Sequence, residues 1–280
     1  MRRRRKSRPT PFTRFPAPGA EIRAYVRANT RKASAGGNPL AKRFLKLLLY
    51  AVGKLSWEQA HALGGFIGAW MAALRVRWSV ARTNLDIVYG DRMDGAEKRR
   101  IYRESWINFG RVMVNHLRLP YMPTEFWRKR VRFPKESALR ELYREGRGMI
   151  LICGHLGMMD LAGGRLGRCG YPVAAIAKPM RSALIDQLVV GAREAMNLST
   201  ISHRNSARRI LKGLRDGEGV VMIADQNMKR SQGIFVDWFG QPATVSPAAA
   251  VFARQTGAPV VVGFLEQVDF GDFKMHMSDA

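Results

Sequence analysis

The chain has 280 residues, of which 46% are hydrophobic, so it can bury a large core without disulfides or a structural metal. Its two cysteines, Cys153 and Cys169, form no Cys-x-x-Cys pair and no zinc-ligand cluster, and no metal or other cofactor is expected. The formal net charge of +25 is high. It leaves three classes of acidic partner open, namely nucleic acid, an anionic membrane surface, and an acidic protein or substrate.

Residues 1–38 are basic and rich in proline. The first 32 of them hold eleven Lys or Arg side chains and one acidic side chain, Glu21. The segment shows no apolar periodicity, and no apolar run follows the first arginines promptly, as it would in a secretory signal. We therefore expect a flexible tail. It either remains in solvent and only keeps the protein soluble, or it attracts the protein to anionic lipid.

Residues 39–80 are more hydrophobic. The run from Ala62 to Leu74 has no charge over thirteen residues, and Trp57, Trp70 and Trp78 lie around it. A membrane-spanning helix needs about 20 apolar residues, which neither this run nor the apolar stretch from Phe44 to Leu55 reaches. We predict a helical hairpin that lies in the membrane interface. A pair of buried core helices and a single tilted transmembrane helix are the alternatives.

Residues 81–280 are predicted to form an α/β domain. A helical pattern continues to about residue 130, and short apolar runs then alternate with helical patterns. We predict strands at 149–153, 173–177, 220–224 and 260–264, and helices at 136–145, 161–168, 183–196, 206–215 and 246–257. Continuous apolar strands that alternate with helices indicate a mainly parallel sheet covered on both faces.

The sequence G-H-L-G-M-M-D, residues 154–160, directly follows the predicted strand 149–153. Ligands bind at the carboxyl ends of parallel strands, so His155 lies where a site is expected. If His155 precedes a helix and Asp160 lies in its first turns, the helix N-terminus keeps the imidazole neutral, as a general base requires. The backbone N–H groups near Gly154 and Gly157 are candidates for an oxyanion site. A structural histidine that caps a helix is the alternative.

A second cluster, with Asp225 at its centre, follows the predicted strand 220–224. Asp225 could lie beside His155 if the two strands are neighbours, and it therefore competes with Asp160 as the carboxylate that orients the base. A Cys153–His155 nucleophile is also conceivable, but this cysteine belongs to an apolar strand.

Further candidates for substrate binding follow other strands. Basic and polar side chains there could meet phosphate groups, and an aromatic stretch punctuated by glycine could line an apolar cleft. The candidate substrate-binding residues are Lys178, Arg181, Arg204, Gln226, Lys229, Gly233, Phe235, Phe239 and Gly240.

The 154–160 block resembles the His-x-x-x-x-Asp/Glu motif of the glycerolipid and lysophospholipid acyltransferases. Over residues 40–265 the chain resembles the lipid A late acyltransferase family, through segments 81–85, 104–110, 178–179, 224–226, 233–240 and 256–260. Asp160 stands where lipid A members often carry Glu. Family members usually continue through a further segment, so the resemblance implies that the end of the domain lies beyond Ala280.

The resemblance implies transfer of a fatty acyl chain from acyl carrier protein to a hydroxyl of a glycolipid, such as a lipid A precursor. His155 would be the general base. The resemblance favours Asp160 over Asp225 as its partner, because Asp160 belongs to the motif. The expected location is the cytoplasmic face of the bacterial inner membrane, with peripheral attachment to an anionic surface.

Two alternatives remain. The first is acylation of another phospholipid or glycolipid, such as mannosylated phosphatidylinositol. The second is a non-catalytic basic protein that binds membrane or nucleic acid, although no nucleic-acid-binding motif is visible and no nucleic acid is expected as a partner.

Overall fold

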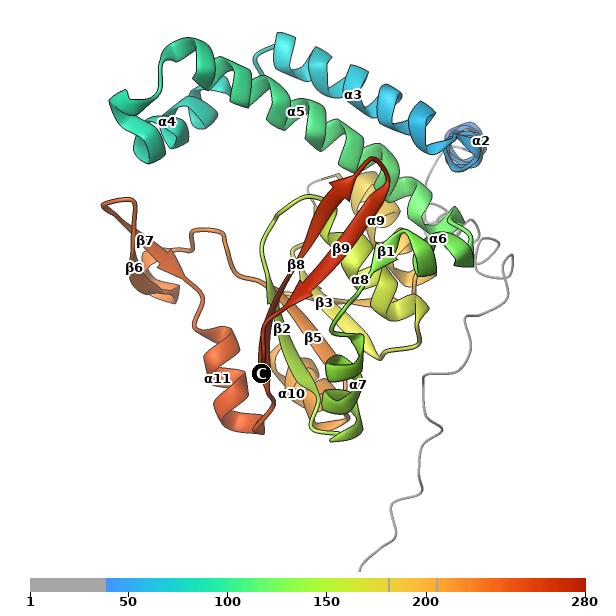
Figure 1. Cartoon of the computed structure of the whole chain (residues 1–280), viewed down its shortest axis with the longest axis vertical. Coiled ribbons are helices and arrows are strands. Elements are labelled where there is room, and N and C mark those ends of the chain that lie inside the picture. Colours follow the sequence, from blue (N-terminus) through green and yellow to red (C-terminus); the bar gives the residue numbers. More distant parts are fainter. Residues whose placement is uncertain (1–38, 181, 205) are drawn as a thin grey trace, which may run out of the picture.

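A computed structural model describes residues 39–180, 182–204 and 206–280, and Figure 1 shows their arrangement. The predicted basic tail, residues 1–38, and the candidate Arg181 lie outside the described residues. Helices α2 to α5 form a layer at the top of Figure 1, above an α/β body. The N-terminal elements are α2 (Pro39–Lys54), α3 (Trp57–Ala73), α4 (Trp78–Tyr89), α5 (Gly95–Arg118) and α6 (Thr124–Lys129), with short 3-10 turns at Gly90–Arg92 and Leu119–Tyr121.

The α/β body follows in the chain. Its elements are β1 (Val131–Arg132), α7 (Glu136–Arg144), β2 (Met149–Cys153), α8 (Met159–Arg168), β3 (Val173–Ala177), α9 (Ala183–Ala195), β4 (Leu198–Ser202), α10 (Ala207–Arg215), β5 (Gly219–Ile223), a 3-10 turn (Arg230–Gln232), β6 (Ile234–Trp238), β7 (Gln241–Val245), α11 (Ala248–Thr256), β8 (Val260–Asp269) and β9 (Asp272–Met277).

Seven of these strands form one sheet in the order β1-β9-β8-β2-β5-β3-β4. Neighbours from β8 to β4 run parallel, and β9 is antiparallel to β8. The predicted α/β class with a mainly parallel sheet is therefore confirmed. The bounds of β2 and β3 are those predicted, whereas β4, β9 and the separate β6–β7 hairpin were not predicted.

Helices cover both faces of the sheet, and strand β2 shows how. Successive side chains of a strand point to opposite faces. Met149 and Leu151 belong to a core with residues of α7 and α8, whereas Ile150 and Ile152 pack with residues of α10 and α11. Both faces of the strand are thus buried, which explains why its sequence is continuously apolar.

Helix α3 packs against α5 through small residues. Its buried residues recur at every fourth position, and they are Ala60, Gly64, Gly68 and Ala72. A Cβ atom on Gly68 would lie 2.1 Å from the Trp106 carbonyl oxygen, and one on Gly110 would lie 2.1 Å from the Gly64 carbonyl oxygen. The two backbones therefore approach so closely that only glycine fits at these positions.

Several large side chains of α3 lie at the surface instead. Leu63, Phe66, Ile67 and Trp70 are all exposed, and Phe66 is 72% exposed. A surface helix of a soluble protein normally buries its large apolar residues and not its small ones. Among the described residues, no helix is both long and apolar enough to span a bilayer.

Candidate active site

The carboxyl ends of four adjacent parallel strands bring most of the predicted site residues to one edge of the sheet. His155 follows β2, and Asp225, Gln226 and Lys229 follow β5. Strands β2 and β5 are neighbours, and Cys153 pairs with Ile223 in their register. Asp225 was expected to reach His155 only if these two strands are neighbours, and they are. Two further predicted cations, Lys178 after β3 and Arg204 after β4, are exposed at the same edge.

The Asp225 carboxylate binds His155 through both of its oxygens. The His155 Nδ1 atom lies 2.7 Å from Asp225 Oδ1, and the His155 backbone N–H donates to Oδ2 over 2.6 Å. A Cβ atom on Gly154 would lie 3.1 Å from Oδ2, so glycine leaves room for this approach. Partial burial alone would raise the pKa of Asp225, but these bonds and the His155 charge outweigh it and hold the pKa below its usual value.

This contact fixes which ring nitrogen is available for chemistry. When Nδ1 carries the proton and donates it to Asp225, Nε2 presents its lone pair. The amide nitrogen of Gln226 is 3.5 Å from Nε2, at the limit of hydrogen-bond distance. Because the side chain of His155 is 40% exposed, a substrate hydroxyl can reach this nitrogen. The arrangement suits a general base.

Asp160 lies in the first turn of α8, as predicted, but its partners differ from those predicted. Its Oδ1 accepts a bond from Arg193 Nε on α9 at 2.7 Å, and its Oδ2 lies 3.2 Å from His116 Nδ1 on α5. No hydrogen bond joins Asp160 to His155 within the described part of the chain. The preference for Asp160 as the carboxylate that holds His155 is therefore wrong, because Asp225 occupies that position.

The cluster around Asp160 is buried. Burial by itself would raise the pKa of Asp160, but the hydrogen bond from His116 and the charges of His116 and Arg193 hold it far below its ordinary value. Sequence reasoning missed His116 and Arg193, which stand on distant helices. The helical pattern around each residue was visible, but not the packing of α5 and α9 against α8.

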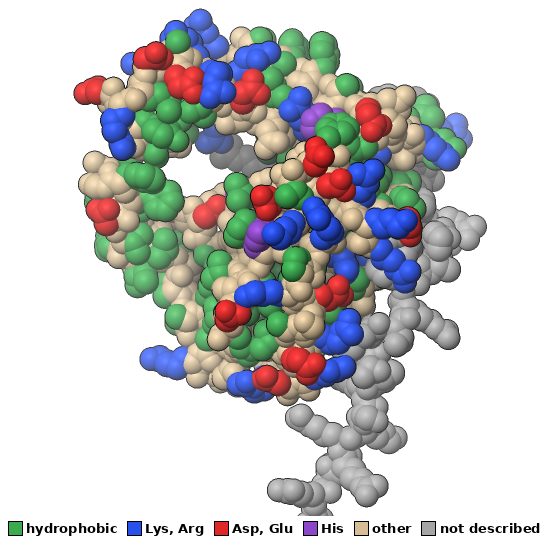
Figure 2. Space-filling view, in the orientation of Figure 1, with side chains coloured by type: hydrophobic (Ala, Val, Ile, Leu, Met, Phe, Trp, Pro, Cys, Tyr) green, Lys and Arg blue, Asp and Glu red, His purple; other side chains and the backbone are tan. Residues whose placement is uncertain are grey.

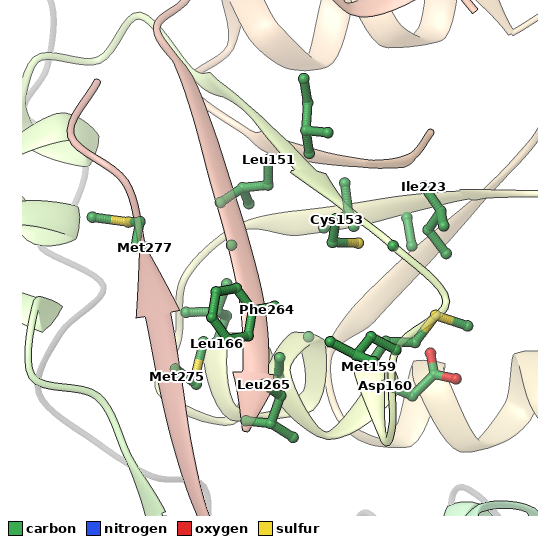
Figure 3. A pocket seen from close by; sticks show the side chains of 18 of the residues that line it. Leu151, Cys153, Met159, Asp160, Leu166, Ile223, Phe264, Leu265, Met275 and Met277 are labelled. Carbon is green, nitrogen blue, oxygen red and sulfur yellow. The ribbon is translucent and has the colours of Figure 1, made fainter. Parts of the chain in front are cut away.

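An apolar cavity lies between strands of the sheet and helix α8 (Figure 3). Gly154 and Leu156, on either side of His155, both line it, and so do Asp160 and Arg193. Its wall comes from β2, α8, β5, β8 and β9, and includes Leu151, Cys153, Met159, Leu166, Ile223, Phe264, Leu265, Met275 and Met277. The largely apolar lining is typical of a site for an apolar ligand.

Cys153 lines this cavity but is a poor nucleophile. Burial, together with the carboxylates of Asp225 and Asp160, raises the pKa of its thiol to about 11. The thiol is therefore protonated at neutral pH, and the thiolate that a nucleophilic cysteine needs is scarce. Among the described residues, no group of three or more His, Cys, Asp or Glu side chains could hold a metal ion.

The remaining candidates are distributed as follows. The oxyanion candidates Gly154 and Gly157 lie in the turn between β2 and α8, and Gly157 has a φ of 55°. The aromatic candidates Phe235 and Phe239 do not line the cavity but lie exposed on the β6–β7 hairpin, which Gly233 precedes and Gly240 helps to turn. An aromatic stretch with glycines is compatible both with an exposed hairpin and with the wall of a cleft. The sequence pattern alone therefore could not distinguish these two structures.

Comparison with known proteins supplies the remaining evidence on identity. Residues 43–277 match the family described as bacterial lipid A biosynthesis acyltransferase. A lipid A biosynthesis acyltransferase of Haemophilus influenzae is 24% identical over 238 residues, which cover 85% of this chain and 74% of that protein. A phosphatidylinositol mannoside acyltransferase of Mycolicibacterium smegmatis is 26% identical over 117 residues, which cover 40% of this chain and 38% of that protein. The chain therefore belongs to the bacterial lipid A biosynthesis acyltransferase family and is an acyltransferase.

Proposed function

We propose that the protein transfers a fatty acyl chain from the thioester of acyl carrier protein to a hydroxyl of a glycolipid, with His155 as general base. Nε2 of His155 removes the proton from the acceptor hydroxyl, and the oxygen attacks the thioester carbonyl. When the tetrahedral intermediate collapses, the carrier thiolate leaves and takes the proton from His155. The products are an ester and a free thiol, and no covalent enzyme intermediate is needed.

One observation carries this proposal: His155, which bonds Asp225, lies between two residues that line an apolar cavity. Asp225 fixes the tautomer of His155 and stabilises the imidazolium that forms during attack. The residues on both sides of His155 line the cavity, so an acyl chain inside it would bring its thioester carbon close to Nε2. Backbone N–H groups of the turn at Gly154 and Gly157 are the proposed oxyanion donors.

Asp160 has a different role in this proposal. It ties the first turn of α8 to Arg193 and His116, and thereby holds the preceding turn, which carries His155. Asp160 is thus a positioning residue and not part of the proton transfer.

The acceptor is proposed to be a phosphorylated glycolipid, a lipid A precursor in the first instance. Lys178, Arg204 and Lys229 are exposed at the site edge of the sheet, where they can pair with lipid phosphates; Gln226 lies beside Nε2. The family match and the Haemophilus influenzae relative favour this acceptor. A phosphatidylinositol mannoside is the second candidate, supported by the shorter match to the mycobacterial enzyme.

We further propose that the protein attaches peripherally to the cytoplasmic face of the inner membrane through the helices of residues 39–80. The exposed large side chains of α3 would be buried in the bilayer interface. Such burial is not screened by salt, whereas purely electrostatic attachment weakens as the Debye length falls from ~10 Å at 0.1 M to ~3 Å at 1 M salt. Membranes washed at high salt should keep most of the protein; complete release would contradict this attachment.

Mass spectrometry of total lipids from cells with and without the gene tests the function. We expect one glycolipid species whose mass shifts by one acyl chain, and His155→Ala should abolish that shift. Purified protein supplied with acyl carrier protein or coenzyme A thioesters then identifies the donor. No lipid that changes by an acyl chain, or an unchanged product pattern in His155→Ala, would contradict the proposal.

A further inference from the structure

The β6–β7 hairpin stands apart from the main sheet, at the left of Figure 1. Among the described residues its two strands pair only with each other. Residues directly opposite in the hairpin share a face, and one face is almost wholly apolar. Its cross-strand pairs are Ile234 with Val245, Val236 with Ala243, and Trp238 with Gln241. Much of this face is open, since Ile234 and Trp238 are both more than half exposed.

The turn of this hairpin holds a bulky aromatic residue in a strained conformation. Phe239 and Gly240 have φ angles of 52° and 73°, the left-handed pair that a tight hairpin turn requires. Gly, Asn and Asp normally occupy such positions, because a bulky side chain there is strained. Phe239 also gains little from packing, since it is 53% exposed and its ring contact is with the equally exposed Trp238. Two exposed aromatic rings therefore form the tip of the hairpin, in spite of the backbone strain.

Charge and position indicate what covers this tip. Lys229 and Arg230, both exposed, precede the hairpin and outnumber its one exposed acidic residue, Asp237, in a chain whose net charge is +25. Hydrophobic side chains of the hairpin gather at the left of Figure 2, across a hollow from those of the upper helical layer. A bilayer with anionic lipid matches this combination, because aromatic rings settle at headgroup depth and nearby cations pair with the headgroups.

We propose that Trp238 and Phe239 insert into an anionic lipid bilayer, so that the β6–β7 hairpin is an anchor distinct from the helices of residues 39–80. The proposal rests on the proposed function only in that the acceptor is a membrane lipid.

The base of the hairpin is linked to the catalytic loop. The Asn227 side-chain oxygen accepts from the Thr244 backbone N–H at 2.9 Å, and the Met228 N–H donates to the Thr244 carbonyl oxygen at 3.1 Å. Asn227 follows Asp225 by two residues. An inserted tip would thus hold the loop that carries Asp225 against the membrane surface, where the acceptor lipid arrives.

Phe239→Gly tests the proposal, because it removes the ring while it relieves the backbone strain. Binding of the full chain to vesicles of phosphatidylglycerol and phosphatidylethanolamine is measured by co-sedimentation, without any acyl donor. The loss of one buried aromatic side chain should weaken partitioning about 10-fold to 100-fold. Thermal unfolding should stay at the wild-type temperature or rise. Phe239→Asn, which also tolerates the left-handed turn, should repeat the result if the glycine variant folds poorly.

Phe270→Gly is the matched control, since Phe270 lies at the turn of the β8–β9 hairpin and packs edge-on against His61. It should bind vesicles like the wild type. Wild-type affinity in Phe239→Gly, as expected if the tip meets another protein or a second copy instead, would overturn the proposal, and so would an equal loss in Phe270→Gly. Acyl transfer is not read in this experiment, so its failure leaves the proposed function untouched.

Discussion

Two aspartates near the catalytic histidine candidate occupy opposite environments. Asp225 lies at the open edge of the sheet, with a side chain 39% exposed, and both of its oxygens contact His155. Asp160 is 15% exposed and lies between a guanidinium and an imidazole on two different helices. The comparison teaches that a carboxylate near a base in sequence can serve the fold, whereas one distant in sequence can serve the chemistry.

The energetic consequences of the two sites differ as well. An exposed carboxylate remains solvated when its partner is removed, so its loss affects the reaction more than folding. A buried carboxylate whose partner is removed is left as an uncompensated charge, which destabilises the fold strongly. Mutation of each site therefore separates catalysis from stability.

The largest expected effect is on the base itself. His155→Ala should lower acyl transfer by about 10²–10⁴-fold, the usual contribution of a positioned base. Its thermal unfolding should match the wild type, because His155 is exposed and belongs to no buried cluster. Single-turnover assays with an acyl thioester measure the first quantity and calorimetry the second. Transfer near the wild-type rate would contradict the base assignment.

The next effect concerns the buried cluster. Arg193→Ala removes one partner of Asp160 and should lower the free energy of unfolding by about 3–5 kcal/mol. Urea unfolding of Arg144→Ala provides the control, because Arg144 pairs with Glu141 at the surface, where both side chains are more than half exposed, and such pairs contribute about 0–1 kcal/mol. Equal losses in both variants would show that the Asp160 cluster is no more important to folding than a surface pair.

The low pKa of Asp160 sharpens the comparison through pH. Since its folded-state pKa lies below the unfolded value of about 3.9, its charge stabilises the fold above that pH. The contribution is lost as the pH falls towards the folded-state pKa. Urea midpoints should therefore differ most between wild type and Asp160→Asn at neutral pH, and the difference should shrink below about pH 4. A difference that does not change with pH would mean that the charge is unimportant.

The smallest effect is expected at Cys153. Its thiol is protonated at neutral pH, so Cys153→Ala should change the rate of transfer only by the small effect of a lost cavity contact. Alkylation by iodoacetamide at pH 7 should also be slow at this residue. A loss of rate as large as that of His155→Ala would revive the cysteine nucleophile.

Much of the sheet could be predicted from the sequence, but not its strand order. Strands β2 and β3 are continuous apolar runs, because helices cover both of their faces. Strand β4, with the sequence LSTIS, buries Leu198 and Ile201 but carries hydroxyl side chains at its other positions, so it shows no such run. Strand β9, with the sequence DFKMHM, is interrupted by a lysine and a histidine, so it shows no continuous apolar run either.

The site was predicted in part. His155, Asp225 and three candidate cations, Lys178, Arg204 and Lys229, were placed at strand or loop ends, and the structure brings them to one edge of the sheet. The choice between the two aspartates depended on whether β2 and β5 are neighbours, which is set by the packing of the whole domain and not by any local pattern. The motif resemblance therefore favoured Asp160, whereas the structure places Asp225 against His155.

The most direct test of the central claim compares Asp225→Asn with Asp160→Asn in one assay of kcat/KM, with unfolding measured alongside. Asp225→Asn should lose transfer nearly as severely as His155→Ala, because the amide can donate to Nδ1 and impose the wrong tautomer, while its unfolding stays unchanged. Asp160→Asn should mainly lose stability and keep the larger share of its activity. A severe loss of rate in a stable Asp160→Asn variant, with Asp225→Asn close to wild type, would contradict the account.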